Sequence, residues 1–475
     1  MVSVECFIRE YVKAIREGNA AVFAGAGLSR ASGFVTWKEL LRPMAEDIGL
    51  NIDDETDLTL VAQYIRNEDG NRGNINDKLI ESFTRDSQLN DNVEIITRMP
   101  ISTYWTTNYD QLIEEGLEKA SRKAAIKKSS SQLSSTNCGV DAVVYKMHGD
   151  AEFPSEAVLT KDDYDQYKKT HPFFRNLLMA DLLSKTFLFI GFSFDDPNLN
   201  FVISELRLQL GENIKNHYCF MKRIQPNECK NNKDYEFKQI RENFHEEYLK
   251  KYGIRIVWLN DFSQITNILT KVERAVLKNN VFISGSISHF DKNWPETRVN
   301  ELAYKLSNSL VKENFRVTSG YGLGIGSAVI TGALDEIYKS KYKHLDANLC
   351  LRPFPQCIAD EFECKNKWTQ YRKDMINDTG IAIFMFGNKI IETSGKKETV
   401  EADGCLEEFE IAKSNNNIII PIGSTGYVAK KIFNEVKAKL SDYLYLKDYI
   451  DILESDTDID NLVKTVTKIA KELRG

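Results

Sequence analysis

The sequence has no long apolar segment and no closely spaced pair of cysteines. None of its apolar runs approaches the roughly 20 residues that a membrane-spanning helix needs. The eight cysteines include no Cys-x-x-Cys motif, and the even steps between Cys350, Cys357 and Cys364 are not the spacing of zinc ligands. We therefore expect no membrane partner and no metal, and we expect free thiols in a reducing cytoplasm.

The chain also lacks a surplus of basic residues. It has 62 Lys and Arg against 69 Asp and Glu, which gives a net charge of −7. This balance does not favour nucleic acid as a partner. The first residues contain no basic region followed by an apolar core, so we expect no signal peptide and a cytoplasmic location. No internal repeat or low-complexity tract stands out.

What is present is enough apolar material for two or three domains, since 42% of the 475 residues are hydrophobic. Short apolar runs alternate with helical patterns, which is typical of α/β folds with parallel sheets. In the first part we expect strands at Ala20–Phe23, Ile101–Thr106, Ala142–Met147, Thr186–Ile190 and Ile254–Leu259, with helices at Trp37–Ile48 and Leu58–Asn67.

Two polar segments interrupt this pattern, and a second cycle of strands begins near residue 278. Ser121–Thr136 is expected to be a surface loop or insertion, and Arg223–Glu247 a loop with a solvated helix. Later strands are expected at Val281–Ser286, Phe315–Ser319, Asn348–Leu351, Ile381–Phe386 and Ile418–Ile422. The prediction is two Rossmann-like, doubly wound α/β domains, at residues 1–277 and 278–475.

Four short motifs follow predicted strands of the first domain. They are Gly25-Ala26-Gly27-Leu28-Ser29, Thr106-Thr107-Asn108-Tyr109-Asp110, His148-Gly149 and Gly191-Phe192-Ser193. Glycine turns let backbone N–H groups approach a diphosphate closely. The alternative for such a turn is plain close packing between a strand and a helix, and the glycines alone leave it open.

Taken in this order, the four motifs resemble the NAD-binding core of the sirtuins. The resemblance implies that His148 is the general base and that Asn108 lies under the nicotinamide ribose. It further implies that Gly25, Ala26, Gly27 and Ser29 hold the diphosphate and its flanking ribose. Asp110 belongs to the same NAD⁺ site and ties down its loop, and Gly191 and Ser193 close the other side of the nucleotide.

The sequence departs from the sirtuin pattern in two places. Sirtuins carry four zinc-ligand cysteines after the His-Gly pair, but no cysteine lies between Cys138 and Cys219 here. The family's Gly-Ile-Pro-Asp-Phe-Arg segment is replaced by residues 33–37, where either Phe34 or Trp37 would cover nicotinamide. Loss of the peptide-binding apparatus favours attack by water on the ribose.

The second domain carries two small-residue turns, Ser284-Gly285-Ser286 and the segment Gly320–Ser327 with its four alternate glycines. These resemble the SLOG fold, which includes the LOG and DprA-like proteins. A flexible loop is the alternative. The resemblance implies an effector site with Gly285, Ser286, Gly322 and Gly324 around phosphates and Glu408 on ribose hydroxyls. Arg372 and Lys389 flank the predicted strand Ile381–Phe386, so we expect them to reach the same crevice as cations for the phosphates. Only half of the hydrolase motif of that group is present, so we expect binding without catalysis.

The order of a sirtuin-like and a SLOG domain resembles the Thoeris antiphage effectors. It implies an NAD⁺ glycohydrolase that yields nicotinamide and ADP-ribose. The implied activator is a cyclic ADP-ribose isomer made by a TIR-domain partner, and the implied assembly is a homo-oligomer, a tetramer or higher. Two rivals remain: an NAD-dependent protein deacylase, disfavoured by the missing cysteines, and a non-catalytic NAD-metabolite sensor, disfavoured by the pairing of Asn108 with His148.

Overall fold

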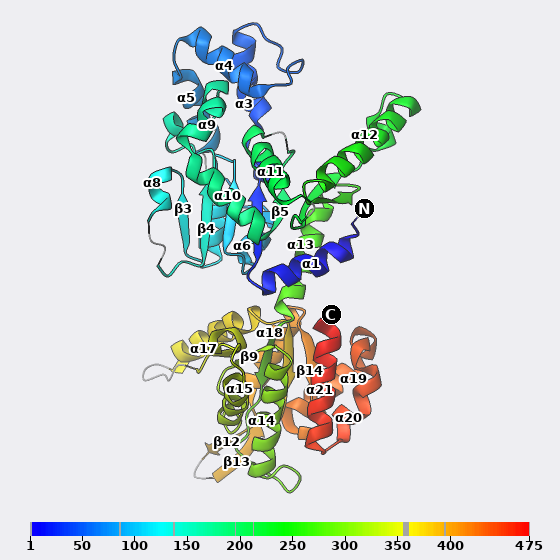
Figure 1. Cartoon of the computed structure of the whole chain (residues 1–475). Coiled ribbons are helices and arrows are strands. Elements are labelled where there is room, and N and C mark those ends of the chain that lie inside the picture. Colours follow the sequence, from blue (N-terminus) through cyan, green and yellow to red (C-terminus); the bar gives the residue numbers. More distant parts are fainter. Residues whose placement is uncertain are drawn as a thin grey trace. The chain divides into compact units, whose positions relative to one another are not determined.

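The computed structural model describes residues 2–84, 87–135, 138–194, 196–211, 213–354, 361–393 and 396–474. They form two compact units, Met1–Glu273 and Arg274–Gly475, each with its own sheet (Figure 1). Helix α13 (Gln264–Leu277) crosses this division. The predicted domain boundary at residue 277 coincides with the end of that helix and stays a prediction.

The first unit contains a seven-stranded sheet in the order β3-β4-β2-β1-β5-β6-β7, and each adjacent pair is parallel. The chain leaves β1 in one direction towards β2 and later returns on its other side as β5. In open parallel sheets, ligands bind at the carboxyl ends of the strands beside such a switch point. The strands are β1 (Ala20–Ala24), β2 (Thr103–Thr106), β3 (Ala124–Lys127), β4 (Ala142–Lys146), β5 (Thr186–Ile190), β6 (His217–Lys222) and β7 (Ile254–Leu259).

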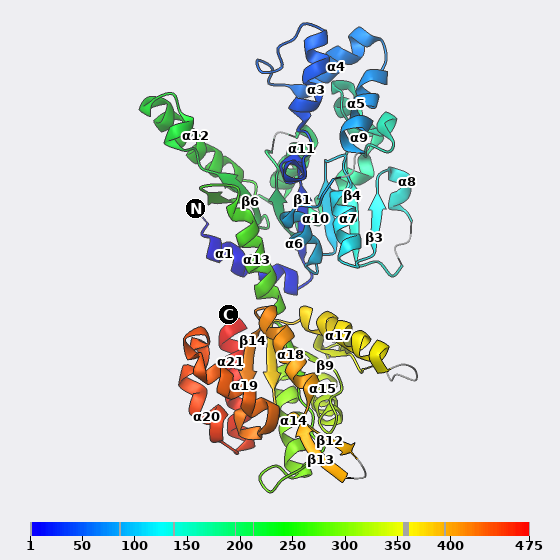
Figure 2. The same cartoon turned by 180° about the vertical axis from the view of Figure 1, so that it is seen from behind.

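Helices cover both faces of this sheet, with α10 and α11 in front of it in Figure 1 and α6 and α7 in front in Figure 2. Because both faces are covered, β1, β2 and β5 are buried along their whole length. The helices are α1 (Val4–Arg16), α2 (Ala26–Ser29), α3 (Trp37–Asp47), α4 (Leu58–Asp69), α5 (Gly73–Phe83), α6 (Asp91–Arg98), α7 (Leu112–Lys119), α8 (Ser130–Leu133), α9 (Lys161–Thr170), α10 (Pro172–Ser184), α11 (Pro197–Leu210), α12 (Asn232–Lys250) and α13.

The segment predicted as a polar loop, Ser121–Thr136, is the main local error of the sequence reading. It contains strand β3 and the short helix α8. Strand β3 lies at the edge of the sheet, where three of its four residues are only half-buried. An edge strand does not need a continuous apolar run, so the serine-rich surroundings concealed it.

The second unit repeats the plan with a five-stranded parallel sheet in the order β10-β9-β8-β11-β14. Here β8 is the switch point, between β9 and β11. The strands are β8 (Asn280–Ser284), β9 (Arg316–Ser319), β10 (Leu349–Leu351), β11 (Ile381–Phe384) and β14 (Ile418–Pro421), and β12 (Asn388–Thr393) pairs with β13 (Lys396–Glu401) in a separate antiparallel hairpin.

Helices α14, α15 and α21 pack on one another in front of this sheet in Figure 1, while α17 and α18 lie in front in Figure 2. The helices are α14 (Glu296–Lys312), α15 (Gly326–Lys339), α16 (Leu345–Asn348), α17 (Glu361–Asn377), α18 (Asp403–Ser414), α19 (Tyr427–Ala438), α20 (Ile450–Ser455) and α21 (Ile459–Arg474). Over the described residues of both units, no helix is long and apolar enough to cross a membrane.

Candidate functional site

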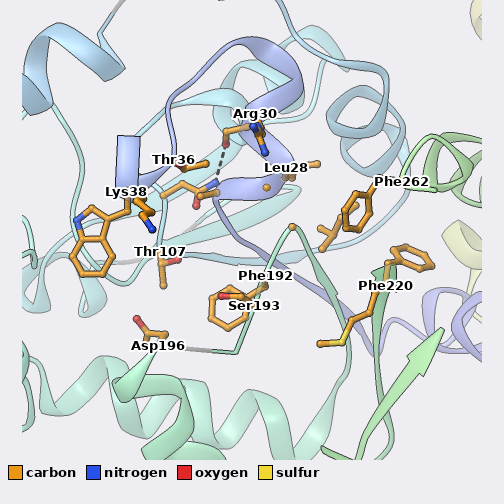
Figure 3. A pocket seen from close by; sticks show the side chains of 18 of the residues that line it. Leu28, Arg30, Thr36, Lys38, Thr107, Phe192, Ser193, Asp196, Phe220 and Phe262 are labelled. Carbon is orange, nitrogen blue, oxygen red and sulfur yellow. Dashed lines mark hydrogen bonds between the residues drawn. The ribbon is translucent and has the colours of Figure 1, made fainter. Parts of the chain in front are cut away.

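A cavity of about 1840 Å³ opens along the carboxyl edge of the first sheet. Its lining follows the order of the strands, from His148 after β4 and Asn108 after β2, past the turns after β1 and β5, to Met221 in β6 and Trp258 in β7. Figure 3 shows Thr107 and Asp196 towards one end of the cavity, with Phe220 and Phe262 towards the other. One continuous cavity therefore spans the ends of six adjacent strands.

The two glycine turns of this site touch each other through their backbones. Gly25 N–H donates to the Ile190 carbonyl at 2.9 Å, and Gly27 N–H donates to the Gly191 carbonyl at 2.9 Å. A Cβ added to Gly191, which has φ +66°, would lie 2.1 Å from the backbone nitrogen of Leu28. Gly25 and Gly27 thus have a packing reason to be glycine, whatever they also bind.

A chain of short hydrogen bonds joins the first turn to the Thr-x-Asn-x-Asp loop. The Asn108 side-chain amide donates to Ser29 Oγ at 2.8 Å, and Ser29 Oγ donates to Asp110 Oδ2 at 2.7 Å. All three side chains are buried. Asp110 Oδ1 also accepts the backbone N–H of Leu112 at 3.2 Å, at the start of α7. The amide of Asn108 is therefore held in one orientation at the wall of the cavity.

The fully buried Lys146 connects this loop to the strand that carries the His-Gly turn. Lys146 is the last residue of β4, and its Nζ donates to the Asp110 carbonyl at 2.5 Å. The same ammonium lies 3.1 Å from a carboxylate oxygen of Glu114 and 3.8 Å from one of Asp150. A buried ammonium with two carboxylates and a carbonyl around it is compensated, and it fixes both loops on one centre.

His148 lies two residues beyond Lys146 and is 2% exposed. Its ring packs edge-on against Tyr164 of α9, with ring centroids 5.3 Å apart. Nε2 is buried and makes no hydrogen bond to any described residue, although Asp196 Oδ2 lies 3.3 Å away. Burial lowers the pKa of His148 below its usual 6.5, and the charge of Asp196 partly opposes this. The imidazole is therefore neutral at pH 7.

The cavity brings together nearly all the residues that the first four motifs suggest. Lining it are Ala26, Gly27, Ser29, Asn108, Asp110, His148, Gly191 and Ser193, while Gly25 packs against Gly191 just behind them. Of the two aromatic candidates, Trp37 lines the cavity and stacks on Tyr164, whereas Phe34 is buried against Phe83.

The sequence analysis did not identify two further residues of the cavity wall, Tyr164 and Asp196. Tyr164 lies on α9, whose sequence is strongly polar and carries no motif. Asp196 precedes Pro197 at the start of α11, a pattern that signals only a helix cap. The available signal was its place three residues after Ser193, beyond the carboxyl end of a buried strand.

In the second unit the glycine turns again meet backbone to backbone. A Cβ on Gly322 would lie 2.0 Å from the Gly285 carbonyl oxygen, and one on Gly324, with φ +78°, would lie 2.2 Å from that of Ile287. Ser286 accepts two backbone N–H groups on its carbonyl, from Gly387 at 2.9 Å and Asn388 at 3.0 Å. These turns therefore lie together at the switch point of the second sheet.

The charged residues predicted for this second site are already paired within the protein. Arg372 Nη1 lies 2.6 Å from Glu407 Oε2, and its Nε lies 3.5 Å from Glu408 Oε1. Glu408 is 7% exposed and accepts the Ser284 hydroxyl at 2.6 Å, and burial raises its pKa. Lys389, on the hairpin strand β12, pairs with Asp403. The binding roles of Arg372, Lys389 and Glu408 stay predictions.

The described residues contain no group of three or more His, Cys, Asp or Glu side chains arranged to hold a metal ion.

Comparison with protein families and curated proteins identifies both units. Residues 102–257 match the SIR2-like domain, and residues 264–473 match the Sir2- and TIR-associating SLOG family. The chain is 43% identical over 442 residues to the NAD(+) hydrolase ThsA of Bacillus cereus (strain MSX-D12), covering 93% of this chain and 91% of that one. It is 42% identical over 468 residues to the NAD(+) hydrolase ThsA of Acinetobacter baumannii (strain 532279), covering 97% of each.

A more distant match covers less of both chains. Defense-associated sirtuin 2 of Bacillus subtilis is 26% identical over 305 residues, which is 60% of this chain and 29% of the relative. The full-length similarity at about 40% identity, the two family matches in the predicted order and the two parallel sheets agree with one another: the chain belongs to the ThsA family of NAD(+) hydrolases.

Proposed function

We propose that this NAD(+) hydrolase breaks the bond between nicotinamide and ribose C1′ with water, releasing nicotinamide and ADP-ribose. His148 takes the proton of the attacking water, and Asn108 orients the water or a ribose hydroxyl. The observation that carries the proposal is the buried, unpartnered Nε2 of His148 on the wall of a cavity that Asn108 also lines. A buried polar atom that has no hydrogen-bond partner in the protein is expected to form a hydrogen bond with the ligand.

The dinucleotide follows the order of the strand ends in this proposal. Nicotinamide and its ribose lie at the β2–β4 end, and the diphosphate lies over the joined turns after β1 and β5. The adenosine half extends towards the ends of β6 and β7, where Phe220 and Trp258 line the cavity. Neighbouring strands are about 4.8 Å apart, so a cavity across six strand ends has room for an extended dinucleotide.

The reaction requires the protein to position NAD⁺ and water and to supply one base. Nicotinamide leaves with the electrons of the C–N bond and loses its positive charge as it departs. The ribose develops positive charge at C1′ as this happens, and the water oxygen forms the new bond. A neutral histidine with a pKa below 6.5 is free to accept the released proton at pH 7. Trp37, stacked on Tyr164 at the wall, excludes water from the nicotinamide side.

For the second domain we propose a sensor role, in which a cyclic ADP-ribose isomer made by a TIR-domain partner activates NAD⁺ cleavage. The family match to a SLOG group that associates with Sir2 and TIR domains supports this. The phosphates of the ligand would replace the carboxylates that now pair with Arg372 and Lys389. The glycine turns would bind the ribose-phosphate backbone. Activation then requires that the ligand bind the active state more tightly than the resting state.

The setting of this activity is also part of the proposal. We infer a cytoplasmic enzyme that works as a homo-oligomer, a tetramer or higher, and depletes NAD⁺ during antiphage defence. No nucleic acid, membrane or metal takes part. The acidic net charge of −7 and the missing zinc-ligand cysteines support the choice of a dinucleotide hydrolase over a nucleic-acid binder or a zinc-dependent deacylase.

The test is a product analysis of NAD⁺ cleavage by the purified full chain. Reactions contain NAD⁺ alone, NAD⁺ with each cyclic ADP-ribose isomer, or NAD⁺ with an acetylated peptide. Free ADP-ribose that increases with one cyclic isomer supports the proposal. Acetylated ADP-ribose formed only with peptide would instead make the protein a deacylase, and tight NAD⁺ binding without any product would make it a sensor.

A further inference from the structure

Asp196 is a buried carboxylate in the cavity wall that the proposed reaction does not use. It is the N-cap of helix α11, where its Oδ1 accepts the backbone N–H of Leu199 at 2.9 Å and Pro197 occupies the first helical position. A cap of this kind needs one side-chain oxygen. The second oxygen of the carboxylate, Oδ2, is not needed for the cap, and in Figure 3 Asp196 lies beside the cavity.

That second oxygen faces His148. Asp196 Oδ2 lies 3.3 Å from Nε2 of the imidazole and 3.4 Å from the Tyr164 hydroxyl, and only 8% of the Asp196 side chain is exposed. The imidazole and the carboxylate do not form a hydrogen bond. Catalytic contacts are often loose before substrate binds and tighten around it.

Phe194, two residues before Asp196, has an unusual backbone conformation. Among the described residues between β5 and α11, Gly191 (φ +66°) and Phe194 (φ +63°) have positive φ. A positive φ is unusual for phenylalanine and persists only where the surroundings enforce it. The Phe194 ring is packed against Phe189 and Phe192, and its carbonyl accepts the Asn200 side-chain amide at 2.7 Å. These contacts hold Phe194 in this conformation at the start of the segment that leads to Asp196.

We propose that Asp196 is a positioning residue for NAD⁺ hydrolysis, because its Oδ2 lies beside Nε2 of His148 and accepts a hydrogen bond from that nitrogen once it has taken the proton of the water. The inference rests on the proposed role of His148. As water attacks, its O–H bond breaks and the proton moves to Nε2, while the oxygen bonds to C1′ and nicotinamide leaves with the electrons of the C–N bond. Asp196 remains a carboxylate and stabilises the imidazolium that forms.

Few other groups near His148 compete for this role. From α9 the ring faces Tyr164 and Tyr167, whose pKa values are raised by burial and which stay neutral. His171, just after α9, also has a pKa lowered by burial. Asp196 is the charged group whose field favours protonation of His148. A carboxylate beside an imidazole favours the protonated ring and so makes the imidazole a better base.

The experiment replaces Asp196 by Asn, Ser and Ala in the full chain. Asn and Ser still cap α11, so a residue that acts only as a cap would be rescued by both and impaired only by Ala. We expect Asp196→Asn and Asp196→Ser to lower kcat by roughly 10²-fold, with KM for NAD⁺ and the melting temperature unchanged. The acidic limb of the pH profile of kcat/KM should move to lower pH in Asp196→Asn, because the imidazole loses its stabilising charge. Wild-type kcat in both capping variants would overturn the inference.

Two further variants distinguish the role of Asp196 from the role of His148 as the base: His148→Ala, and the double variant His148→Ala with Asp196→Asn. If Asp196 acts through His148, the double variant should be no slower than His148→Ala alone. A further loss in the double variant would overturn the inference. Wild-type rates in His148→Ala would refute the proposed role of His148 and with it this inference, whereas an inactive His148→Ala beside a fully active Asp196→Asn would refute only the role of Asp196.

Discussion

The carboxyl edges of the two sheets have similar backbone turns but different functional side chains. Each has a pair of glycine turns packed backbone to backbone at the switch point of a parallel sheet. The first edge leaves the buried Nε2 of His148 without a hydrogen bond. At the second edge, Arg372 and Lys389 are neutralised by carboxylates of α18. The first arrangement suits a reaction that needs a base able to accept a proton. The second suits a site whose cations stay paired with carboxylates until an anionic ligand competes for them.

The largest effect is expected from the first edge. His148→Ala should lower NAD⁺ cleavage by about 10²–10⁴-fold, the usual loss when a positioned base is removed. Asn108→Ala should act similarly, because the orienting amide is lost. Steady-state rates, with thermal melting to confirm folding, test both. Near-normal turnover in either variant would make that residue a structural part of its turn.

A pair of glycine variants tests the shared construction. Gly191→Ala should destabilise the protein by about 3 kcal/mol or more, because the new Cβ would meet the backbone of Leu28 at 2.1 Å and the helix cannot yield. Gly139 has a similar φ of +63° with nothing within 4 Å of a Cβ, so Gly139→Ala should cost only about 1–2 kcal/mol. Equal unfolding free energies for the two variants would show that the turns are not in tight contact.

The second edge should respond through activation. Arg372→Ala should raise the concentration of cyclic ADP-ribose isomer needed for half-maximal NAD⁺ cleavage by roughly 10- to 100-fold, which corresponds to about 1.5–3 kcal/mol for a lost charge-assisted contact. Lys389→Ala should have a milder effect, since lysine offers a point charge and not a fork. The exposed Lys447 provides a control substitution to Ala. An unchanged titration for Arg372→Ala would mean that the effector binds elsewhere.

The pH dependence sharpens the contrast, because only the first edge depends on a neutral base. Burial places the pKa of His148 below 6.5, so the ring is neutral, and active, at pH above that value. We expect kcat/KM to be level above neutral pH and to fall about tenfold per pH unit once the pH is below the pKa. A fall that is centred above pH 6.5 in the wild type, and absent in His148→Ala, would contradict the assigned environment of the imidazole.

The smallest effect is expected from metal chelation. Because no cysteine lies between Cys138 and Cys219, we expect chelators to leave the rate of NAD⁺ cleavage unchanged. Elemental analysis before and after treatment provides the control. Stoichiometric zinc whose removal abolishes cleavage would contradict this expectation.

The fold was accessible from the sequence where strands are buried on both faces. Thr186–Ile190 and Ile254–Leu259 have the predicted bounds, and the central strands begin and end close to theirs. Strand β6 was missed although four of its residues are buried, because His217 and Lys222 at its ends break the apolar run. His217 is accommodated by accepting the Phe187 N–H on its ring nitrogen, a contact that only the folded sheet creates.

The site was predictable as far as its residues lie in motifs. His148 and Asn108 were found because each follows a strand within a recognisable pattern, and the structure brings both to one cavity. Asp196 and Tyr164 were not found, because their place in the wall depends on how α9 and α11 pack across the strand ends. The pairing of Arg372 with Glu407 was equally hidden, since it joins two helices that are separate in sequence.

The buried ammonium of Lys146 has a dynamic consequence. It holds the Asp110 carbonyl, Glu114 and Asp150 at one point, between the loop of Asn108 and the turn of His148. Opening either segment alone would leave a buried charge without its partner, which typically costs about 3–5 kcal/mol. The two segments should therefore open together or not at all, and their backbone amides should exchange with deuterium at one common rate. The alignment of amide and imidazole is in this sense a property of the closed unit, kept between turnovers without help from the substrate.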